Sequence, residues 1–109
     1  MEKTLDEIDF EKSGGLVPVI VQDANTKNVL TLAYTNKESL ELAKKTGNSW
    51  FWSRSRNKLW MKGEESGNTQ KIKEILVDCD SDAIIYLVEP SGPACHTGEN
   101  VCFHNSLEK

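Results

Sequence analysis

The sequence predicts a small α+β domain, rich in β-structure, that is built from antiparallel hairpins and one main helix. Most apolar runs are short and rich in β-branched residues, which is typical of strands. Only residues 37–45 combine helical spacing with capping residues at both ends. A chain of 109 residues with 38% hydrophobic residues suits a single core. Because burial is modest at this size, we expect a bound metal ion or a partner subunit to add stability.

The chain is predicted to begin with a flexible arm, residues 1–14, ahead of a single domain over residues 15–109. The arm is rich in Glu, Asp and Lys and leads into two glycines, which is typical of a mobile or loosely docked segment. The domain opens with a predicted hairpin whose strands are residues 16–22 and 29–34. Pro18 lacks a backbone donor, which favours an edge position for the first strand.

One helix is predicted over residues 37–45. Asn36 can cap its first turn, and Gly47 can end it in a left-handed conformation. Leu40 and Ala43 fall on one face at helical spacing, opposite the charged side. One such helix is enough for a domain of this size.

Two more hairpins are predicted after the helix. Their strands are residues 49–56, 59–62, 70–77 and 83–88. Alternation along the first of these strands would place Arg54 and Arg56 on the same face. The short acidic link between the last two strands suits a hairpin tip. From Pro90 onward the sequence has no clear period, so we expect irregular structure that is fixed by a metal ion.

The charge of the chain argues against a general nucleic-acid binder. The formal net charge is -4, yet six basic residues and only two acidic ones lie between Arg54 and Lys73. A local cationic patch on an acidic protein predicts a pocket for a small anion rather than a track for a polyanion. The three cysteines cannot all be paired within one chain, and no leader or membrane-length apolar run is evident. We therefore expect a reducing, cytoplasmic setting without membrane contact.

The densest chemical signal lies in the last third of the chain, which holds all three cysteines: Asp78-Cys79-Asp80-Ser81-Asp82, Cys95-His96 and Cys102. Thiolates select zinc, whereas carboxylates suit a harder cation such as magnesium. On a strand Cys79 would point away from Asp78 and Asp80, so the two kinds of ligand would diverge. Three sulfur ligands would leave zinc a fourth position for water, as in a hydrolytic centre. Histidine is the side chain most often used for proton transfer near neutral pH, so His96 is the candidate proton acceptor there.

The basic stretch and the loop after it supply candidate residues for binding an anion. Arg54 and Arg56 could grip a phosphate, with Lys62 in the same patch. Ser66 and Asn68, in the flexible loop that follows, offer a hydroxyl and an amide that could contact a phosphate or a ribose.

Other interpretations stay open at this point. His96 or His104 could close a four-ligand structural zinc site, and the aspartates could be turn residues without a metal. The tryptophans between Trp50 and Trp60 could pack in the core or frame a base-stacking surface. In that case the chain could be a non-enzymatic zinc module that binds single-stranded nucleic acid through the Trp50–Trp60 hairpin. A zinc-stapled dimer that only scaffolds a partner is a further alternative.

Several unusual motifs follow one another along the chain: Trp52-Ser53-Arg54-Ser55-Arg56, Leu59-Trp60, Lys62-Gly63-Glu64, Asp78-Cys79-Asp80-Ser81-Asp82 and Cys95-His96-Thr97-Gly98. Together, from about Gly15 to Phe103, they resemble the phosphoribosyl-AMP cyclohydrolase family. The resemblance implies hydrolysis of the N1–C6 bond of the adenine ring in phosphoribosyl-AMP. The implied product is the formimino-aminoimidazole carboxamide ribonucleotide ProFAR, in histidine biosynthesis.

The resemblance also implies two kinds of metal ion, in a homodimer whose zinc ligands come from both subunits. The implied zinc ligands are Cys79, Cys95 and Cys102. The implied magnesium ligands are Asp78, Asp80 and Asp82. The resemblance points to His96 as important for catalysis. Many members have histidine where this chain has Asn68, and an amide can hydrogen-bond a substrate but cannot shuttle protons near neutral pH.

Overall fold

The structure is a computed structural model that describes residues 2–109. In chain order its elements are η1 (Leu5–Glu7), η2 (Glu11–Ser13), β1 (Val17–Asp23), β2 (Val29–Thr35), α1 (Lys37–Thr46), β3 (Trp50–Ser53), β4 (Lys58–Met61), β5 (Gln70–Val77) and β6 (Ile84–Pro90). The described part of the chain is therefore a small α+β domain of strands with one α-helix, as predicted. None of its helices has the length and apolar character needed to cross a membrane.

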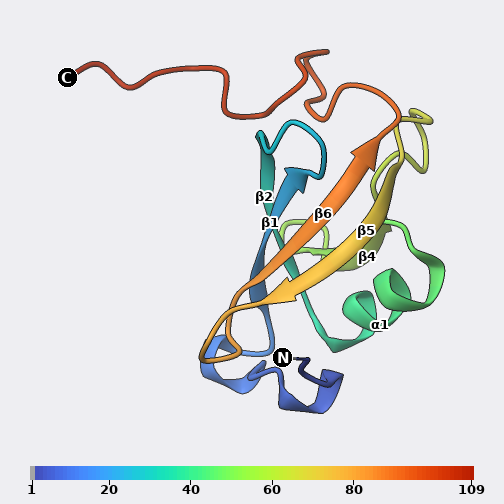
Figure 1. Cartoon of the computed structure of the whole chain (residues 1–109), viewed down its shortest axis with the longest axis vertical. Coiled ribbons are helices and arrows are strands. Elements are labelled where there is room, and N and C mark those ends of the chain that lie inside the picture. The colour runs from blue at the N-terminus through green and yellow to red at the C-terminus, as the bar shows by residue number, and fades with distance from the viewer. Residues whose placement is uncertain (1) are drawn as a thin grey trace.

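Four strands form an open sheet in the order β2-β1-β6-β5, and β3 pairs with β4 in a separate sheet (Figure 1). The hairpins β1–β2, β3–β4 and β5–β6 are antiparallel, which confirms the three predicted hairpins. In addition, β1 pairs in parallel with β6, beginning with Val19 opposite Ile84. The sequence pattern did not predict this pairing, because contacts between distant segments leave no local periodic signal.

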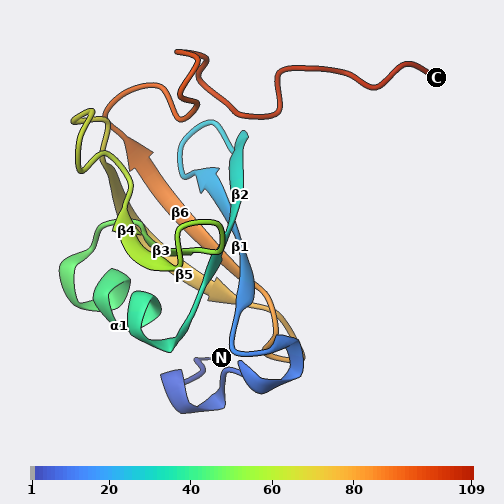
Figure 2. The same cartoon turned by 180° about the vertical axis from the view of Figure 1, so that it is seen from behind.

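The core lies on one face of the four-stranded sheet, on the side of α1 and the β3–β4 hairpin (Figure 2). Alternate residues of β1, Val17, Val19 and Val21, are fully buried, because successive side chains of a strand point to opposite faces. Leu40 and Ala43 of α1 belong to the same buried cluster. The predicted inward face of the helix is therefore confirmed.

An aromatic group ties the β3–β4 hairpin to this core. The ring centroid of Phe51 lies 4.9 Å from that of Trp60 and 5.7 Å from that of Tyr86. The Tyr86 hydroxyl donates a 3.0 Å hydrogen bond to the backbone oxygen of Trp50, and burial raises the pKa of Tyr86. Trp50 and Trp60 pack against the buried cluster. For these two tryptophans the structure supports core packing over a base-stacking surface.

Both predicted caps of α1 are present. The side-chain oxygen of Asn36 accepts a 2.8 Å hydrogen bond from the Ser39 backbone N–H. At the other end Gly47 has φ 76° and donates its N–H to the Ala43 oxygen at 2.9 Å. Only glycine adopts this left-handed conformation without steric cost. The local sequence thus sets where the helix begins and ends.

Pro18 does not mark an edge strand, so that prediction is wrong. β1 is an interior strand with β2 on one side and β6 on the other. The reason is the register: Pro18 pairs with Tyr34 of β2, whereas pairing with β6 begins only at Val19. The missing donor of Pro18 therefore costs no hydrogen bond to β6.

Arg54 and Arg56 do not share a strand face, so that prediction is also wrong. β3 ends at Ser53, and residues 54–57 form the turn that leads into β4. The Ser53 hydroxyl accepts a 3.2 Å hydrogen bond from the Arg56 N–H, and Asn57 has φ 53°. A serine side chain that bonds to the backbone three residues later and an asparagine with positive φ both favour a turn over a continued strand.

The segment before β1 lies against the body of the domain. Ile8 is buried, and Leu5 and Phe10 pack against the buried cluster. Lys3 and Lys12 both reach the loop between β5 and β6. The predicted flexibility of residues 1–14 stays a prediction, but these contacts place the segment beside a candidate metal site.

Candidate metal and nucleotide site

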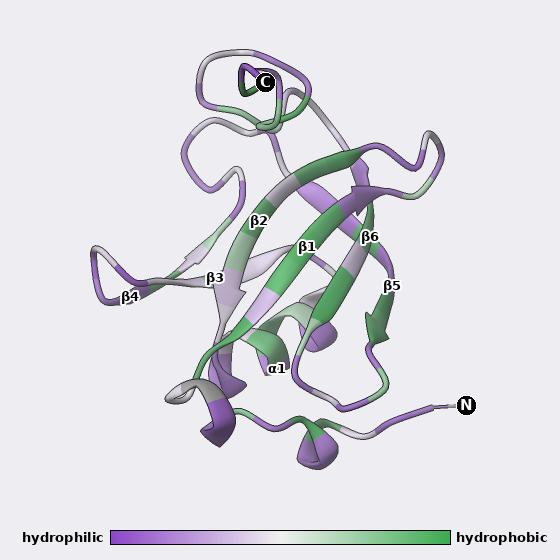
Figure 3. Ribbon diagram, turned by 90° about the vertical axis from the view of Figure 1, so that its left-hand side faces the viewer, coloured by the Kyte–Doolittle hydropathy of each residue, from purple (hydrophilic) through white to green (hydrophobic). Residues whose placement is uncertain are grey.

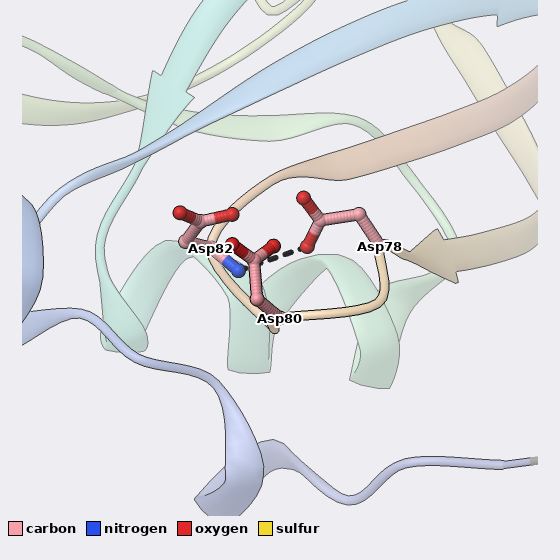
Figure 4. A group of neighbouring side chains, drawn as sticks. All are labelled: Asp78, Asp80 and Asp82. Atoms are coloured by element: carbon pink, nitrogen blue, oxygen red, sulfur yellow. Dashed lines mark hydrogen bonds between the residues drawn. The ribbon is translucent and has the colours of Figure 1, made fainter.

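The loop between β5 and β6 gathers three carboxylates (Figure 4). One oxygen from each of Asp78, Asp80 and Asp82 lies within 4.8 Å of the other two. Asp78 holds the loop in shape, because its Oδ1 accepts hydrogen bonds from the backbone N–H groups of Asp82 (2.9 Å) and Ala83 (3.2 Å). Carboxylate oxygens at this spacing suit a hard divalent cation such as magnesium. The residues present therefore fit such an ion.

Two lysines of the N-terminal segment bind to this loop, and one of them pairs with its carboxylates. The Lys12 ammonium lies 2.8 Å from Asp82 Oδ2 and 3.5 Å from Asp80 Oδ2. Its hydrogen bond lowers the pKa of Asp82 to about 2, whereas the neighbouring carboxyl groups of Asp82 and Asp78 raise the pKa of Asp80. The Lys3 ammonium instead donates to the backbone oxygens of Asp78 and Cys79 and to the Ser81 hydroxyl.

The three cysteines lie at opposite ends of β6. Cys79 is exposed in the β5–β6 loop, whereas Cys95 and Cys102 belong to the irregular segment that follows Pro90. Figure 1 shows this loop at the lower end of the sheet and the segment after β6 at the upper end. A strand of seven residues separates the two ends, which corresponds to about 20 Å at 3.3 Å per residue. Within one chain the three sulfur atoms therefore do not meet.

Cys95 and Cys102 are close to each other and share a polar environment. The Thr97 hydroxyl donates to the Cys95 sulfur at 3.1 Å, and Nε2 of His104 lies 3.9 Å from it. These contacts, led by Thr97, lower the pKa of Cys95 to about 6. The Cys102 N–H donates to the Leu30 oxygen at 2.7 Å, which ties the segment to β2. A thiol that ionises near neutral pH beside a second thiol fits a zinc ion, because thiolates are the zinc-binding form.

Four of the five predicted anion-binding residues, all except Asn68, line two neighbouring hollows that share Trp60. The first, about 540 Å³, is lined by Leu32, Tyr34 and Arg54 among others, and the Arg54 guanidinium lies 3.8 Å from the centre of the Tyr34 ring. The second, about 190 Å³, is lined by side chains that include Arg56, Lys62 and Ser66. The turn between β3 and β4 thus directs the two arginines into different hollows.

Asn68 lies apart from these hollows, against the segment that leads to Cys95. A side chain at Gly92 would come within 2.3 Å of Asn68 Oδ1, so the amide occupies the space over that glycine. The Ser91 N–H donates to the Thr69 oxygen at 2.9 Å, and the Ser91 hydroxyl donates to the Gly67 oxygen at 3.3 Å. The loop that carries Asn68 is therefore fastened to the cysteine segment.

Comparison with known proteins identifies the family. A profile of the phosphoribosyl-AMP cyclohydrolase family matches residues 31–104. The chain is 88% identical over 108 residues to the phosphoribosyl-AMP cyclohydrolase of Nitrosopumilus maritimus. The aligned region covers 99% of this chain and 100% of that protein. It is 79% identical to the phosphoribosyl-AMP cyclohydrolase of Cenarchaeum symbiosum, over 98% of this chain and 99% of that protein. The chain belongs to the phosphoribosyl-AMP cyclohydrolase family.

A histidine biosynthesis bifunctional protein of Thermus thermophilus is 58% identical over 94% of this chain, which covers 48% of that protein. The cyclohydrolase family profile spans every candidate ligand and substrate residue named above. Sequence reasoning missed three residues that the structure adds to the site. Thr97 lies within the motif Cys95-His96-Thr97-Gly98 but was given no role of its own, and Tyr34 lies in no motif. The role of Gly92 is visible only from its close approach to Asn68.

Proposed function

We propose that this chain hydrolyses the N1–C6 bond of the adenine ring in 1-(5-phosphoribosyl)-AMP, giving ProFAR in histidine biosynthesis. The observation that carries the proposal is the 88% identity to a phosphoribosyl-AMP cyclohydrolase along the whole of that protein. The thiols, the carboxylates and the basic hollows supply the chemistry that such a reaction needs. We place the enzyme in the cytoplasm, where free thiols persist, with no nucleic acid or membrane as partner.

The zinc ligands in this proposal come from two subunits of a homodimer. Cys79 of one chain and the pair Cys95 and Cys102 of the other would hold one ion, because the two sets lie at opposite ends of β6 in a single chain. The lowered pKa of Cys95 supports this role. When bound there, zinc supplies an activated water for attack on the purine ring and keeps a position open for it.

Magnesium is the proposed ion for the carboxylates Asp78, Asp80 and Asp82. Their oxygens already lie within 4.8 Å of one another, and such an ion binds phosphate groups together with carboxylates. In the described structure the ammonium of Lys12 contacts two of these carboxylates, those of Asp80 and Asp82. Binding of the divalent ion would therefore replace this contact with a stronger one.

The chain's own residues would orient the substrate and move protons. Arg54, Arg56 and Lys62 bind the two phosphate groups, since guanidinium and ammonium groups pair with phosphate oxygens. The ribosyl group on N1 makes C6 electrophilic. The exposed imidazole of His96, beside Cys95, takes the proton released when water adds to C6 and returns it as the N1–C6 bond breaks. Ser66 and Asn68 would hydrogen-bond to the substrate, with Asn68 in no proton-transfer role.

The proposal is tested by the ultraviolet absorbance of phosphoribosyl-AMP in the presence of the purified protein, before and after zinc chelation. Opening the six-membered ring changes the chromophore, so the absorbance should change with the untreated protein and stay constant after chelation. Cys95→Ser should lose bound zinc and turnover together, because it removes one of three sulfur ligands. A zinc-free Cys95→Ser protein that still turns over the substrate would refute the zinc mechanism. An untreated protein without any turnover would refute the function.

A further inference from the structure

Ser81, in the loop between β5 and β6, adopts a backbone conformation that serine rarely takes. Its φ is 63°, in the left-handed region, where the Cβ atom of any residue except glycine crowds the backbone. Of the described residues, the other non-glycine positions with positive φ are Lys27 and Asn57, which are exposed in the loops after β1 and β3. Ser81 is instead buried. The structure around Ser81 must therefore hold it in this conformation.

The conformation of Ser81 sets the path of the chain between two of the candidate metal ligands. Asp80 and Asp82 flank Ser81 in the sequence, and the Ser81 N–H donates to the backbone oxygen of Asp78 at 3.2 Å, which closes a turn. In this turn the three carboxylates lie together, as Figure 4 shows. A change of Ser81 to negative φ would redirect the chain that follows and would carry Asp82 away from the other two.

Two hydrogen bonds from the N-terminal segment hold Ser81. The Asp9 N–H donates to the Ser81 backbone oxygen at 2.8 Å, and the Lys3 ammonium donates to the Ser81 hydroxyl at 2.7 Å. The same ammonium donates to the backbone oxygens of Asp78 at 3.1 Å and of Cys79 at 3.0 Å. An ammonium group has three N–H donors, and the loop takes all of them. Lys3 therefore ties together the beginning and the end of the turn.

The backbone that carries Lys3 is itself anchored. Ile8 of the same segment is buried. The Thr4 N–H donates to a side-chain oxygen of Glu7 at 3.2 Å, and the Glu7 N–H donates to the Thr4 oxygen at 3.0 Å. Figure 3 shows the segment running below the loop between β5 and β6 before it enters β1. A lysine on an anchored backbone loses less conformational entropy on bonding to the loop than one on a mobile arm.

We propose that Lys3 is a positioning residue of the candidate metal site: it holds Ser81 in the left-handed conformation and so keeps the three carboxylates of the loop together. The inference rests on the proposed function, because it takes these carboxylates as ligands of a divalent cation. Lys12 contacts carboxylate oxygens, which the ion itself needs. Lys3 contacts a hydroxyl and two backbone oxygens, so Lys3 and the ion can be bound at the same time.

The sign of the effect of removing Lys3 separates this role from a purely electrostatic one. If the ammonium acted on the ion only through its charge, its loss would relieve repulsion and tighten magnesium binding. If it orders the loop, its loss leaves the loop formed in only a fraction of the molecules, and the apparent affinity for magnesium falls with that fraction. At about 1 M salt, where the screening length is about 3 Å, the repulsion is largely removed and the ordering remains.

The test is Lys3→Met, which keeps an apolar side chain of similar length but has no donor. The matched control is Lys44→Met, at an exposed lysine of α1 that lines the same small hollow as Lys3. Amide hydrogen exchange of the ion-free full chain is followed by nuclear magnetic resonance, and magnesium affinity is measured by titration calorimetry at high salt. Lys44→Met should leave both quantities unchanged.

In Lys3→Met the amides of Asp82 and Ala83, which donate to Asp78 Oδ1, should exchange at least about tenfold faster. Magnesium should bind about threefold more weakly. Glycine takes positive φ without crowding, so in a Ser81→Gly background Lys3→Met should weaken magnesium by about 1.5-fold or less. If Lys3→Met unfolds the chain, Ser81→Ala decides the matter. It keeps the crowding at positive φ and removes the hydroxyl, so exchange at the same two amides should rise.

Wild-type exchange at these amides in Lys3→Met overturns the inference, as does magnesium bound as tightly as in wild type or more tightly. An equal loss of affinity in the wild-type and Ser81→Gly backgrounds overturns the route through Ser81. The proposed function fails separately, because the exchange measurement needs neither ion nor substrate. Faster exchange in Lys3→Met of a protein that does not turn over phosphoribosyl-AMP refutes the function alone. Turnover by a protein whose loop is equally ordered without Lys3 refutes the inference alone.

Discussion

The two ends of β6 hold their candidate metal ligands in different ways. At the Ile84 end the loop is ordered by its own hydrogen bonds, because Asp78 accepts two backbone N–H groups and the three carboxylates gather around one point. At the Pro90 end Cys95 and Cys102 sit in irregular structure that is tied to β2 by Cys102. The proposed hard-ion site thus uses ligands of one turn, whereas the thiol pair would supply only two of the three sulfur ligands of the proposed zinc site.

The largest expected effect comes from removing one cysteine at each end of β6, in two separate variants. Cys79→Ser and Cys102→Ser should each lower turnover by roughly a thousandfold or more, because each removes a ligand from both zinc sites of a dimer. When the two variants are unfolded and refolded together, one site of each mixed dimer regains all three sulfur atoms. Half of the dimers are mixed, so about a quarter of wild-type turnover and zinc should return.

The matched control is a mixture of Cys95→Ser with Cys102→Ser. These substitutions lie on the same end of β6, so every zinc site in the mixed dimer still lacks a sulfur ligand and turnover should not return. Recovery in this control, or none in the first mixture, would contradict ligands shared between the two ends. Zinc is measured by mass spectrometry and turnover by absorbance.

The second-largest effect concerns the acidic end of β6, the loop that carries Asp78, Asp80 and Asp82. Asp78→Ala should lower both the affinity for magnesium and the free energy of unfolding, the latter by about 1–2 kcal/mol, because two backbone N–H groups lose their acceptor. Asp80→Ala should weaken magnesium on the order of tenfold by removing a carboxylate ligand, and should leave the unfolding curve in urea unchanged. Titration calorimetry and urea denaturation measure the two quantities. Equal unfolding curves for both variants would show that Asp78 does not order the loop.

Local elements of the fold were predictable from the sequence, and contacts between distant elements were not. Asn36 and Gly47 predicted the two ends of the helix, because a helix cap depends only on residues next to that end. Strand β5 spans Gln70–Val77 as predicted, because its neighbours on both sides are turn-rich. The parallel pairing of β1 with β6 and the interior position of Pro18 depend on segments far apart in the chain. No local pattern encodes them.

The candidate site divides in the same way. The carboxylates of Asp78, Asp80 and Asp82 converge because the three residues share one turn, and their spacing made the cluster visible in the sequence. The cysteines are close in sequence, yet β6 carries the chain away between Cys79 and Cys95. The seven-residue length of that strand, rather than ligand spacing, sets how far apart the sulfur atoms lie.

A smaller effect is expected from Lys12, the cation that already occupies the acidic end. Lys12→Gln should bind magnesium about fivefold more tightly in dilute buffer, because the ammonium 2.8 Å from Asp82 no longer competes with the ion. The gain should shrink at high salt, which screens exposed charges. Lys45→Gln removes one positive charge from α1 and should leave the affinity unchanged. Equal gains in both variants would point to overall charge rather than to this contact.

The smallest effect concerns the Pro90 end of β6, where Gly92 lies under Asn68 in the segment that leads to Cys95. Gly92→Ala should raise KM for phosphoribosyl-AMP about threefold with little change in stability, because the added methyl group would come within 2.3 Å of Asn68 Oδ1 and would push aside a flexible side chain. In an Asn68→Ala background the same substitution should leave KM unchanged, since the amide is gone. If Gly92→Ala raises KM equally in both backgrounds, it acts on the backbone of the cysteine segment instead. The Asn68 amide would then have no part in fastening its loop to that segment.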